Sequence, residues 1–216
     1  MDKYYKFVSN DLLRINTIWC VGRNYSEHAK EMGAKTEDEP IIFLKPNSSA
    51  LLNNKIILPE FSNDVHFETE IVFVVGEDAK DISETDALNV ISGVGVGLDL
   101  TLRDIQSELK KKSLPWALSK SFANSAPLSR IVPIKDVNIS HLEFEMYLNS
   151  KLTQKAHINE MVFSINQIIA YISSRFSLQK GDCIFTGTPA GVGKLQSKDK
   201  IFVSLQNILE WNLEVL

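Results

Sequence analysis

The stretch HFETEIVFVVG, residues 66–76, ends in an uninterrupted apolar run that begins directly after two acidic residues. The run is short and rich in β-branched and aromatic side chains, so residues 70–75 are predicted to form a buried strand. Glu68 and Glu70 stand two positions apart at the mouth of this strand, and the period of two points both carboxylates to the same face. The segment therefore predicts a strand with a pair of like charges at one end.

Apolar runs of the same kind recur along the chain and predict further strands. They lie between turn residues at positions 17–21, 41–44, 183–186, 201–205 and 209–215. Residues 142–148 alternate between apolar and polar side chains, and Asn149-Ser150 and a second strand-like run follow them. This pattern predicts a half-exposed hairpin.

Helical patterns are fewer than strand patterns. The clearest covers residues 164–176, where isoleucines and Phe176 form one apolar stripe, and Ser164 with Gln167 has the spacing of a capping box. Residues 25–32 and 102–112 are shorter candidates. Scattered helices without regular alternation of strands and helices favour a mixed α+β architecture over a doubly wound one. No linker-like stretch interrupts the chain, so we expect a single domain over residues 1–216.

The composition argues against several classes of protein. The 216 residues are 44% hydrophobic and 23% charged, as in an ordinary globular domain. The formal net charge is −4 and no basic stripe is present, which argues against nucleic-acid binding. The lysine run at residues 110–112 is interpreted as a solvated helix end. No apolar stretch is long enough to cross a membrane and the start MDKYYKFVSND has no signal or transit pattern, so we expect no membrane contact and a cytoplasmic location. Cys20 and Cys183 are too few for a disulfide framework and are interpreted as small buried residues.

Two glycine-rich segments do not match nucleotide-binding motifs. In GVGVGLD, residues 93–99, Leu98 stands where the dinucleotide fingerprint requires a glycine. In TGTPAGVGKL, residues 186–195, Thr188 replaces the first glycine of a P-loop and Leu195 replaces its Ser or Thr. The sequence also lacks the spacings of an H-E-x-x-H zinc site, paired C-x-x-C motifs, a G-x-S-x-G nucleophile and an EF-hand loop.

A third acidic residue changes the interpretation of the pair Glu68 and Glu70. On its own the pair also fits an ordinary solvated strand face. Asp99, however, ends a segment whose three glycines permit close approach by a ligand or another strand. Three carboxylates without a cysteine favour a hard divalent ion, Mg²⁺ or Mn²⁺, over zinc.

His28 and Glu31 form a second candidate pair. They lie three positions apart in NYSEHAKEM, residues 24–32, and on a helix this spacing makes them neighbours on one face. A carboxylate beside an imidazole holds its tautomer and stabilises its protonated form, as a general base requires. The same spacing also fits a surface pair, and both interpretations stay open on the pattern alone.

Six segments taken together resemble a known family. VGRNYSEHAKEM, PIIFLKP, HFETEIVFVVG, GLDLTLRDIQ, LPWALSKSF and GDCIFTGTPAGVG follow one another in this order and cover nearly the whole chain from about Ile18 onward. As a set they resemble the fumarylacetoacetate hydrolase family and are most similar to its short acylpyruvase and oxaloacetate decarboxylase branch. The chain begins almost directly at that family's catalytic core, which argues against the tyrosine-degradation role of the long members.

The resemblance implies a fold and a set of site residues. The implied fold is the mixed β-sandwich roll of the fumarylacetoacetate hydrolase C-terminal domain, mostly β with a few short helices, usually as a homodimer. Glu68, Glu70 and Asp99 match the family's Mg²⁺ ligands. The matched catalytic positions are a dyad on a helix that orders as a lid over the substrate, His28 and Glu31, and the active-site lysine, Lys120. Four further matched positions lie near the substrate in related enzymes: Arg23, Arg103, Gln106 and Thr188.

The implied reaction is metal-dependent cleavage of a C–C bond in a small 2-oxo acid. It is either hydrolysis of an acylpyruvate to pyruvate and a carboxylic acid or decarboxylation of oxaloacetate, with the metal and Lys120 stabilising a pyruvate enolate. For hydrolysis, His28 oriented by Glu31 is expected to take a proton from water, and the amides of residues 187–193 with the Thr188 hydroxyl are expected to hold the substrate carboxylate. Two alternatives stay open: an oxo-acid isomerase or tautomerase on the same site, and a non-catalytic, metal-stabilised binding protein.

Overall fold

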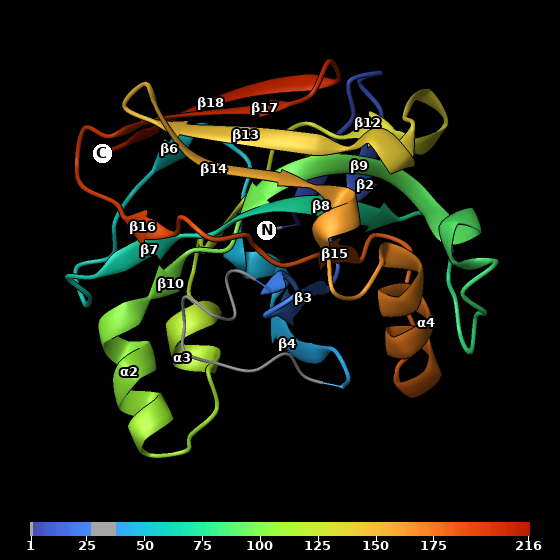
Figure 1. Cartoon of the computed structure of the whole chain (residues 1–216), viewed down its shortest axis with the longest axis horizontal. Helices are drawn as coiled ribbons and strands as arrows, with labels where there is room; N and C mark the ends of the chain where they lie inside the picture. The colour runs from blue at the N-terminus through green and yellow to red at the C-terminus, as the bar shows by residue number, and fades with distance from the viewer. Residues whose placement is uncertain (1, 27–37) are drawn as a thin grey trace.

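The computed structural model describes residues 2–26 and 38–216, and in this part of the chain the strands form two larger sheets and three small ones (Figure 1). The central sheet has the strand order β12-β9-β8-β15-β3-β4. Its members are β12 (Val132–Pro133), β9 (Ile91–Leu98), β8 (Thr69–Val75), β15 (Cys183–Phe185), β3 (Ile18–Gly22) and β4 (Ile41–Lys45). Neighbouring strands are antiparallel except for β15 and β3, which run parallel. This mixed sheet confirms the predicted α+β class, made mainly of strands.

A second sheet packs over one face of the central sheet, at the top of Figure 1. Its strand order is β14-β13-β17-β18-β6. The strands are β14 (Lys151–His157), β13 (Glu143–Leu148), β17 (Lys200–Leu205), β18 (Leu209–Val215) and β6 (Lys55–Ile56). Strands β13 and β14 form the predicted hairpin, and Asn149 and Ser150 have φ angles of 51° and 68° in its turn. Positive φ at both central residues is the signature of a type I′ turn.

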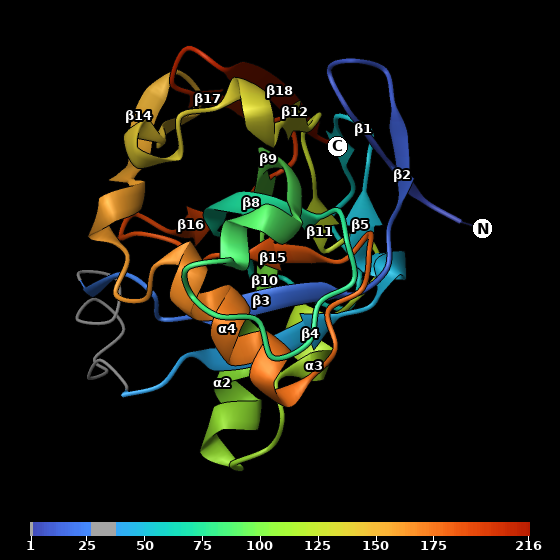
Figure 2. The same ribbon diagram turned by 90° about the vertical axis from the view of Figure 1, so that its right-hand side faces the viewer.

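The small sheets close the edges of the molecule. One joins β10 (Thr101–Leu102), β7 (Val65–Phe67) and β16 (Gly193–Lys194), and another joins β11 (Ala126–Pro127) and β5 (Ala50–Leu51). The third is the N-terminal hairpin of β1 (Tyr4–Lys6) and β2 (Leu12–Arg14), which Figure 2 shows along one side of the molecule. The Val8 N–H donates to the Ile131 carbonyl at 2.8 Å, which ties this hairpin to the segment before β12.

Three α-helices lie within the described residues: α2 (Arg103–Lys111), α3 (Ala117–Lys120) and α4 (Ile165–Arg175). Helix α4 matches the predicted helix, and the Ser164 side chain accepts from the Gln167 N–H in the predicted capping box. Short 3₁₀ turns cover Asn47–Ser49, Ala87–Val90, Ile134–Asp136, Ile139–His141 and Ile158–Glu160. The helix predicted at residues 25–32 falls largely outside the described residues. Among the helices described, none has the length and apolar character needed to cross a membrane.

Strand β8 contributes to two separate apolar cores. Ile71, Phe73 and Val75 pack into the main core between the two large sheets, whereas Val72 and Val74 pack into a second core on the opposite face. This alternation follows from the period of two along a strand, and it explains why every residue of β8 is buried. The second core also contains both cysteines, which are free and buried as predicted.

The glycines of β9 allow this strand to pack closely against its neighbours. A Cβ at Gly97 would lie 2.6 Å from the Phe185 ring, and one at Gly93 would lie 2.5 Å from Ile131 Cγ2. No side chain is accommodated at such distances without movement of the surrounding core. The glycine-rich segment, which matched no nucleotide-binding motif, is therefore a buried strand that ends immediately before Asp99.

Candidate metal centre

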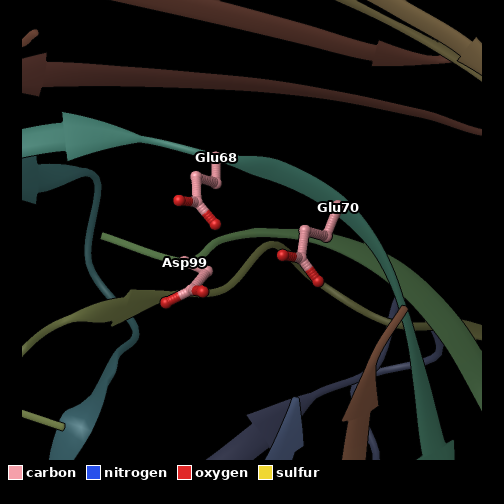
Figure 3. Close-up of side chains that lie close together, drawn as sticks. All are labelled: Glu68, Glu70 and Asp99. Atoms are coloured by element: carbon pink, nitrogen blue, oxygen red, sulfur yellow. The ribbon is translucent and has the colours of Figure 1, made fainter. Parts of the chain in front are cut away.

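Three buried carboxylates meet where β8 begins and β9 ends (Figure 3). Each of Glu68, Glu70 and Asp99 offers one carboxylate oxygen within 4.8 Å of the others, and their exposed fractions are 6%, 2% and 1%. The β8–β9 ladder produces this arrangement, because it pairs Glu70 with Gly97 and continues with a 2.8 Å hydrogen bond from the Asp99 N–H to the Glu68 carbonyl. The sheet register thus brings together the three acidic residues that the sequence singled out.

Glu70 is the member of the triad whose ionisation is most clearly disfavoured by its surroundings. Burial raises the pKa of Glu70 well above its ordinary value, and the nearby charges of Asp99 and Glu68 raise it further. The Gly187 N–H donates to Glu70 Oε2 at 2.7 Å and acts in the opposite direction. Such a cluster of like charges needs cations close by to remain ionised.

Three cationic side chains surround the carboxylates. The Lys120 ammonium donates to Glu68 Oε2 at 2.8 Å and also contacts Asp99 Oδ2, while Arg103 Nη2 donates to Glu68 Oε1 at 2.5 Å. On the other side of the cluster, Lys45 Nζ lies 2.8 Å from Asp99 Oδ1. Burial alone would lower the pKa of Lys120, but the Asp99 and Glu68 carboxylates raise it above its ordinary value, so this lysine is protonated at neutral pH.

The donor set of this cluster suits a hard divalent cation. Its candidate ligands are carboxylate oxygens, which Mg²⁺ and Mn²⁺ prefer, and no histidine or cysteine joins them among the described residues. Asp99 Oδ1 is buried and accepts no hydrogen bond from the part of the chain that is described, although Lys45 compensates its charge. The three buried carboxylates supply hard oxygen donors within 4.8 Å of one another, so the residues present fit a divalent cation.

One pocket brings together the predicted metal ligands, Lys120 and the four predicted substrate residues. It is lined by Arg23, Arg103, Gln106, Thr188, Lys120 and the three carboxylates, and by Phe43, Lys110, Trp116, Val21 and Gly22. Helix α2 places Arg103 and Gln106 on the same face, where Arg103 Nη1 donates to Gln106 Oε1 at 2.9 Å. His28 and Glu31 lie outside the described residues, so their predicted role as a catalytic dyad stays a prediction.

The Thr188 hydroxyl is part of a network between the two large sheets. It donates to the Thr69 carbonyl at 2.9 Å and accepts from Gln154 Nε2 at 2.8 Å. Gln154 is a buried residue of β14, and its Oε1 accepts from the Thr69 N–H at 3.1 Å. Because the hydroxyl proton is already donated to Thr69, any donor that Thr188 offers to a substrate in this geometry is its main-chain N–H.

Two residues of the site were not singled out from the sequence pattern. Lys45 is fully buried at the end of β4 and donates to Ser125 Oγ at 2.9 Å in addition to facing Asp99. A single lysine after an apolar run is ordinarily exposed, and the one available signal was its place in the segment PIIFLKP. Asn24 is also fully buried, donating to the Thr186 carbonyl at 2.8 Å and accepting from the Phe163 N–H at 2.8 Å. Asn24 thereby fixes the chain beside the turn that follows β15.

Comparison with known proteins identifies one family. The family model described as "Fumarylacetoacetate (FAA) hydrolase C-terminal" matches residues 17–215. Among curated proteins, the chain is 38% identical over 200 residues to human "Oxaloacetate tautomerase FAHD1, mitochondrial", covering 92% of this chain and 90% of that protein. It is 43% identical over 184 residues to "Oxaloacetate decarboxylase, mitochondrial" of Dictyostelium discoideum, covering 83% and 84% of the two chains.

A solved structure agrees with the fold over the whole chain. The fumarylpyruvate hydrolase from Pseudomonas aeruginosa, solved with Mn²⁺ and pyruvate, superposes with a TM-score of 0.95 at 29% identity. The match covers 100% of this chain and 96% of that one. The sheets, the turn after β15 and the acidic cluster described above therefore lie within a fold shared with that enzyme.

Proposed function

Because the chain belongs to the fumarylacetoacetate hydrolase family, we propose that it is a Mg²⁺- or Mn²⁺-dependent enzyme that cleaves a C–C bond in small 2-oxo acids and releases pyruvate. The candidate reactions are decarboxylation of oxaloacetate to pyruvate and CO₂, and hydrolysis of an acylpyruvate to pyruvate and a carboxylic acid. Both pass through the enolate of pyruvate. The observation that carries the proposal is the buried triad of Glu68, Glu70 and Asp99 with the Lys120 ammonium between two of its members.

The three carboxylates are the residues proposed to hold the metal ion. A divalent cation bound there would supply Lewis-acid chemistry, drawing electron density from the keto oxygen of a 2-oxo acid as the enolate forms. The pocket wall around the triad is formed by Phe43, Trp116 and the turn that contains Thr188. Their side chains limit the space open to water next to the reacting carbons.

Lys120 is proposed to stabilise the negative charge that develops on the substrate. Its ammonium is buried, remains protonated because Asp99 and Glu68 raise its pKa, and lines the same pocket as the triad. A fixed cation in a site that excludes water stabilises a developing oxyanion far more than the same charge in solution. Arg103, held by Glu68 and Gln106, is proposed to orient the substrate carboxylate.

The hydrolytic reaction needs a base that decarboxylation does not need. We propose His28, oriented by Glu31, as the group that removes a proton from the attacking water. His28→Ala is expected to slow acylpyruvate hydrolysis by about 10²- to 10⁴-fold, the usual contribution of a general base, and to affect decarboxylation less. Equal loss of both reactions would contradict this assignment.

A second candidate function is tautomerisation of a 2-oxo acid such as oxaloacetate. The name of the human relative favours it, and the chemistry requires the same enolate but no C–C cleavage. The two candidates give different products: cleavage releases pyruvate, whereas tautomerisation changes the enol absorbance without releasing pyruvate.

The test is a pyruvate-release assay with oxaloacetate, fumarylpyruvate and acetylpyruvate, run after chelation and again after addition of Mg²⁺ or Mn²⁺. Free divalent ions also decarboxylate oxaloacetate, so each reaction needs a control with metal and no protein. We expect pyruvate release that is abolished by the chelator and restored by the metal. A change in enol absorbance without pyruvate would replace the cleavage proposal with the tautomerase, and metal-dependent melting without any turnover would indicate the non-catalytic binding protein.

The ligand assignment has its own test. Glu70→Gln and Asp99→Asn each remove one charge from the triad with little change of shape, and Glu108→Gln on the exposed face of α2 is the matched control. We expect both triad variants to lose bound metal, measured by elemental analysis after gel filtration, and the control to retain it. Retention of stoichiometric metal by both triad variants would refute the assignment.

Two further features are proposed: assembly as a homodimer, from the family resemblance, and a cytoplasmic location, from the absence of a signal or transit pattern in the sequence. Light scattering of the purified protein measures the first and cell fractionation the second. The relatives described above carry the word mitochondrial in their names, so the fractionation must include that compartment where the source cell has one.

A further inference from the structure

Helix α2 presents a third residue to the pocket besides Arg103 and Gln106. Lys110 follows them at spacings of three and four, which places all three on one face of the helix, and all three line the pocket. The lysine run was expected to be a solvated helix end. Lys110 is indeed exposed, but it lies at the rim of the pocket that contains the acidic triad.

The surroundings of Lys110 differ from those of its neighbour Lys111. Lys111 Nζ forms an ion pair with Glu108 at 2.8 Å, whereas Lys110 forms none with the described residues. Lys110 Nζ instead lies 5.9 Å from the centroid of the Trp116 ring. Trp116 packs against Phe43 with a centroid separation of 5.9 Å, and Lys120 Nζ lies 5.2 Å from the Phe43 ring. The two lysines therefore flank one aromatic pair, Lys120 inside the pocket and Lys110 at its rim.

The charges around Lys110 are predominantly positive. Partial burial lowers its pKa, and the charges of Arg103, Arg23 and Lys120 lower it further, while Glu68 acts in the opposite direction. Among the described residues, four cationic side chains and three carboxylates line this pocket. This described part of the lining has a formal excess of one positive charge, which a bound divalent ion would raise to three. A pocket with that balance suits a substrate that carries more than one negative charge.

We propose that Lys110 binds the acyl-chain carboxylate of a dicarboxylic acylpyruvate and thereby makes the enzyme selective for dicarboxylic over monocarboxylic acylpyruvates. The inference rests on the proposed function, which places the keto oxygen at the metal held by the triad and the adjacent carboxylate near Arg103. The carboxylate at the other end of the substrate then reaches the rim, where Lys110 supplies a cation without an acidic partner among the described residues. Fumarylpyruvate carries such a carboxylate at the end of its acyl chain, where acetylpyruvate has only a methyl group. In oxaloacetate the second carboxylate is the group expelled as CO₂, so oxaloacetate does not test this contact.

The test compares substrates that differ in this second carboxylate. Lys110→Met removes the charge and keeps an unbranched apolar stem, Lys110→Arg keeps the charge, and Lys111→Met is the matched control on the same helix. The quantity measured is the ratio of kcat/KM for fumarylpyruvate to kcat/KM for acetylpyruvate, two acylpyruvates that undergo the same hydrolysis. We expect Lys110→Met to lower this ratio by about 10-fold, between the effects of an exposed ion pair and of a charged hydrogen bond. The loss should fall on KM for the dicarboxylic substrate rather than on kcat, because the contact is present in both ground and transition states.

The remaining outcomes decide between the inference and the proposed function. Lys110→Arg should restore most of the ratio, Lys111→Met should leave it at the wild-type value, and added salt should lower it in the wild type more than in Lys110→Met. An unchanged ratio in Lys110→Met, or an equal loss on both substrate classes, overturns the role of Lys110 and leaves the proposed function standing. Absence of turnover of every 2-oxo acid by the wild-type protein with metal present overturns the proposed function itself.

Discussion

Replacing Lys45 with methionine measures how strongly the acidic triad depends on its buried counter-charge. Lys45 is fully buried, its Nζ lies 2.8 Å from Asp99 Oδ1, and it donates to the Ser125 carbonyl at 3.1 Å. Methionine retains the apolar stem and removes both the charge and the donors. Removal of one partner from a buried ion pair costs about 3–5 kcal/mol when the other charge is left uncompensated. Lys120 still contacts Asp99, so this range is the upper limit for Lys45→Met. For a chain of this size that range corresponds to a fall in Tm of roughly 6–20 °C.

The assay is urea unfolding followed by tryptophan fluorescence, in chelator and again with saturating Mg²⁺. The cost of Lys45→Met should be smaller with the metal, because a dication beside Asp99 supplies the missing positive charge. Lys55→Met, at an exposed position of β6, is the control and should change the free energy of unfolding by less than about 0.5 kcal/mol. In an Asp99→Asn background the cost of Lys45→Met should fall, since the carboxylate that pairs with Lys45 is no longer charged. A cost no larger than that of Lys55→Met, or an identical cost in both backgrounds, would refute the reasoning.

Three other predictions concern stability and use the same unfolding assay. Burial raises the pKa of Glu70 in the folded state, so in chelator the native protein binds more protons than the unfolded chain. Its stability should therefore fall as pH rises above the ordinary glutamate range. Glu70→Gln should flatten this pH dependence, and a wild-type stability that rises with pH would contradict the prediction. Gly97→Ala places a Cβ 2.6 Å from the Phe185 ring and should lower the free energy of unfolding by about 1–3 kcal/mol. Gly22→Ala is the control, because its Cβ has its nearest neighbour at 3.6 Å and should leave the stability close to that of the wild type. Equal losses of stability in the two variants would refute the packing argument. Ser164→Ala removes the N-cap of α4 and should cost about 1 kcal/mol without changing kcat/KM, so a loss of activity at full stability would show that α4 has a role beyond packing.

Hydrophobic patterning was sufficient to predict most of the large elements. The run at residues 209–215 is β18, the run at residues 70–75 is β8 with one added residue, and the capping signals around Ser164 locate the start of α4. These predictions succeeded because burial of a strand or of one helix face imposes a period that a single sequence displays.

Strand β9 was not predicted because its glycines conceal the pattern. Gly93, Gly95 and Gly97 occupy positions where a strand ordinarily shows side chains, and only the three-dimensional packing against Ile131, Ser129 and Phe185 reveals why none is present. The register that sets Asp99 beside Glu68 was equally invisible, since it depends on hydrogen bonds between strands. The residues suggested that the three carboxylates form one hard-metal site, the family resemblance matched them to metal ligands, and the structure supplies the physical cause of their convergence.

The sequence predicted the placement of some charged residues and not of others. Spacing indicated that Glu68 and Glu70 share one side of a strand, but nothing local distinguishes the buried Lys45 from an exposed lysine or the rim position of Lys110 from the ion pair of Lys111. Burial of a charge is decided by partners that lie far away in the chain, here Asp99 and Ser125 for Lys45.

The three carboxylates lie at one end of the β8–β9 ladder, Glu70 within it and Glu68 and Asp99 directly beside it, so a cation held there would cross-link these two adjacent strands. An ion that binds the native ladder and not the unfolded chain adds a free energy of RT ln(1 + [L]/Kd), which is about 2.7 kcal/mol at a hundredfold excess over Kd. The melting temperature measured at increasing metal concentration therefore reports the binding of metal to this centre. Different divalent metals can be ranked by the concentration at which each raises the melting temperature, before any substrate is known.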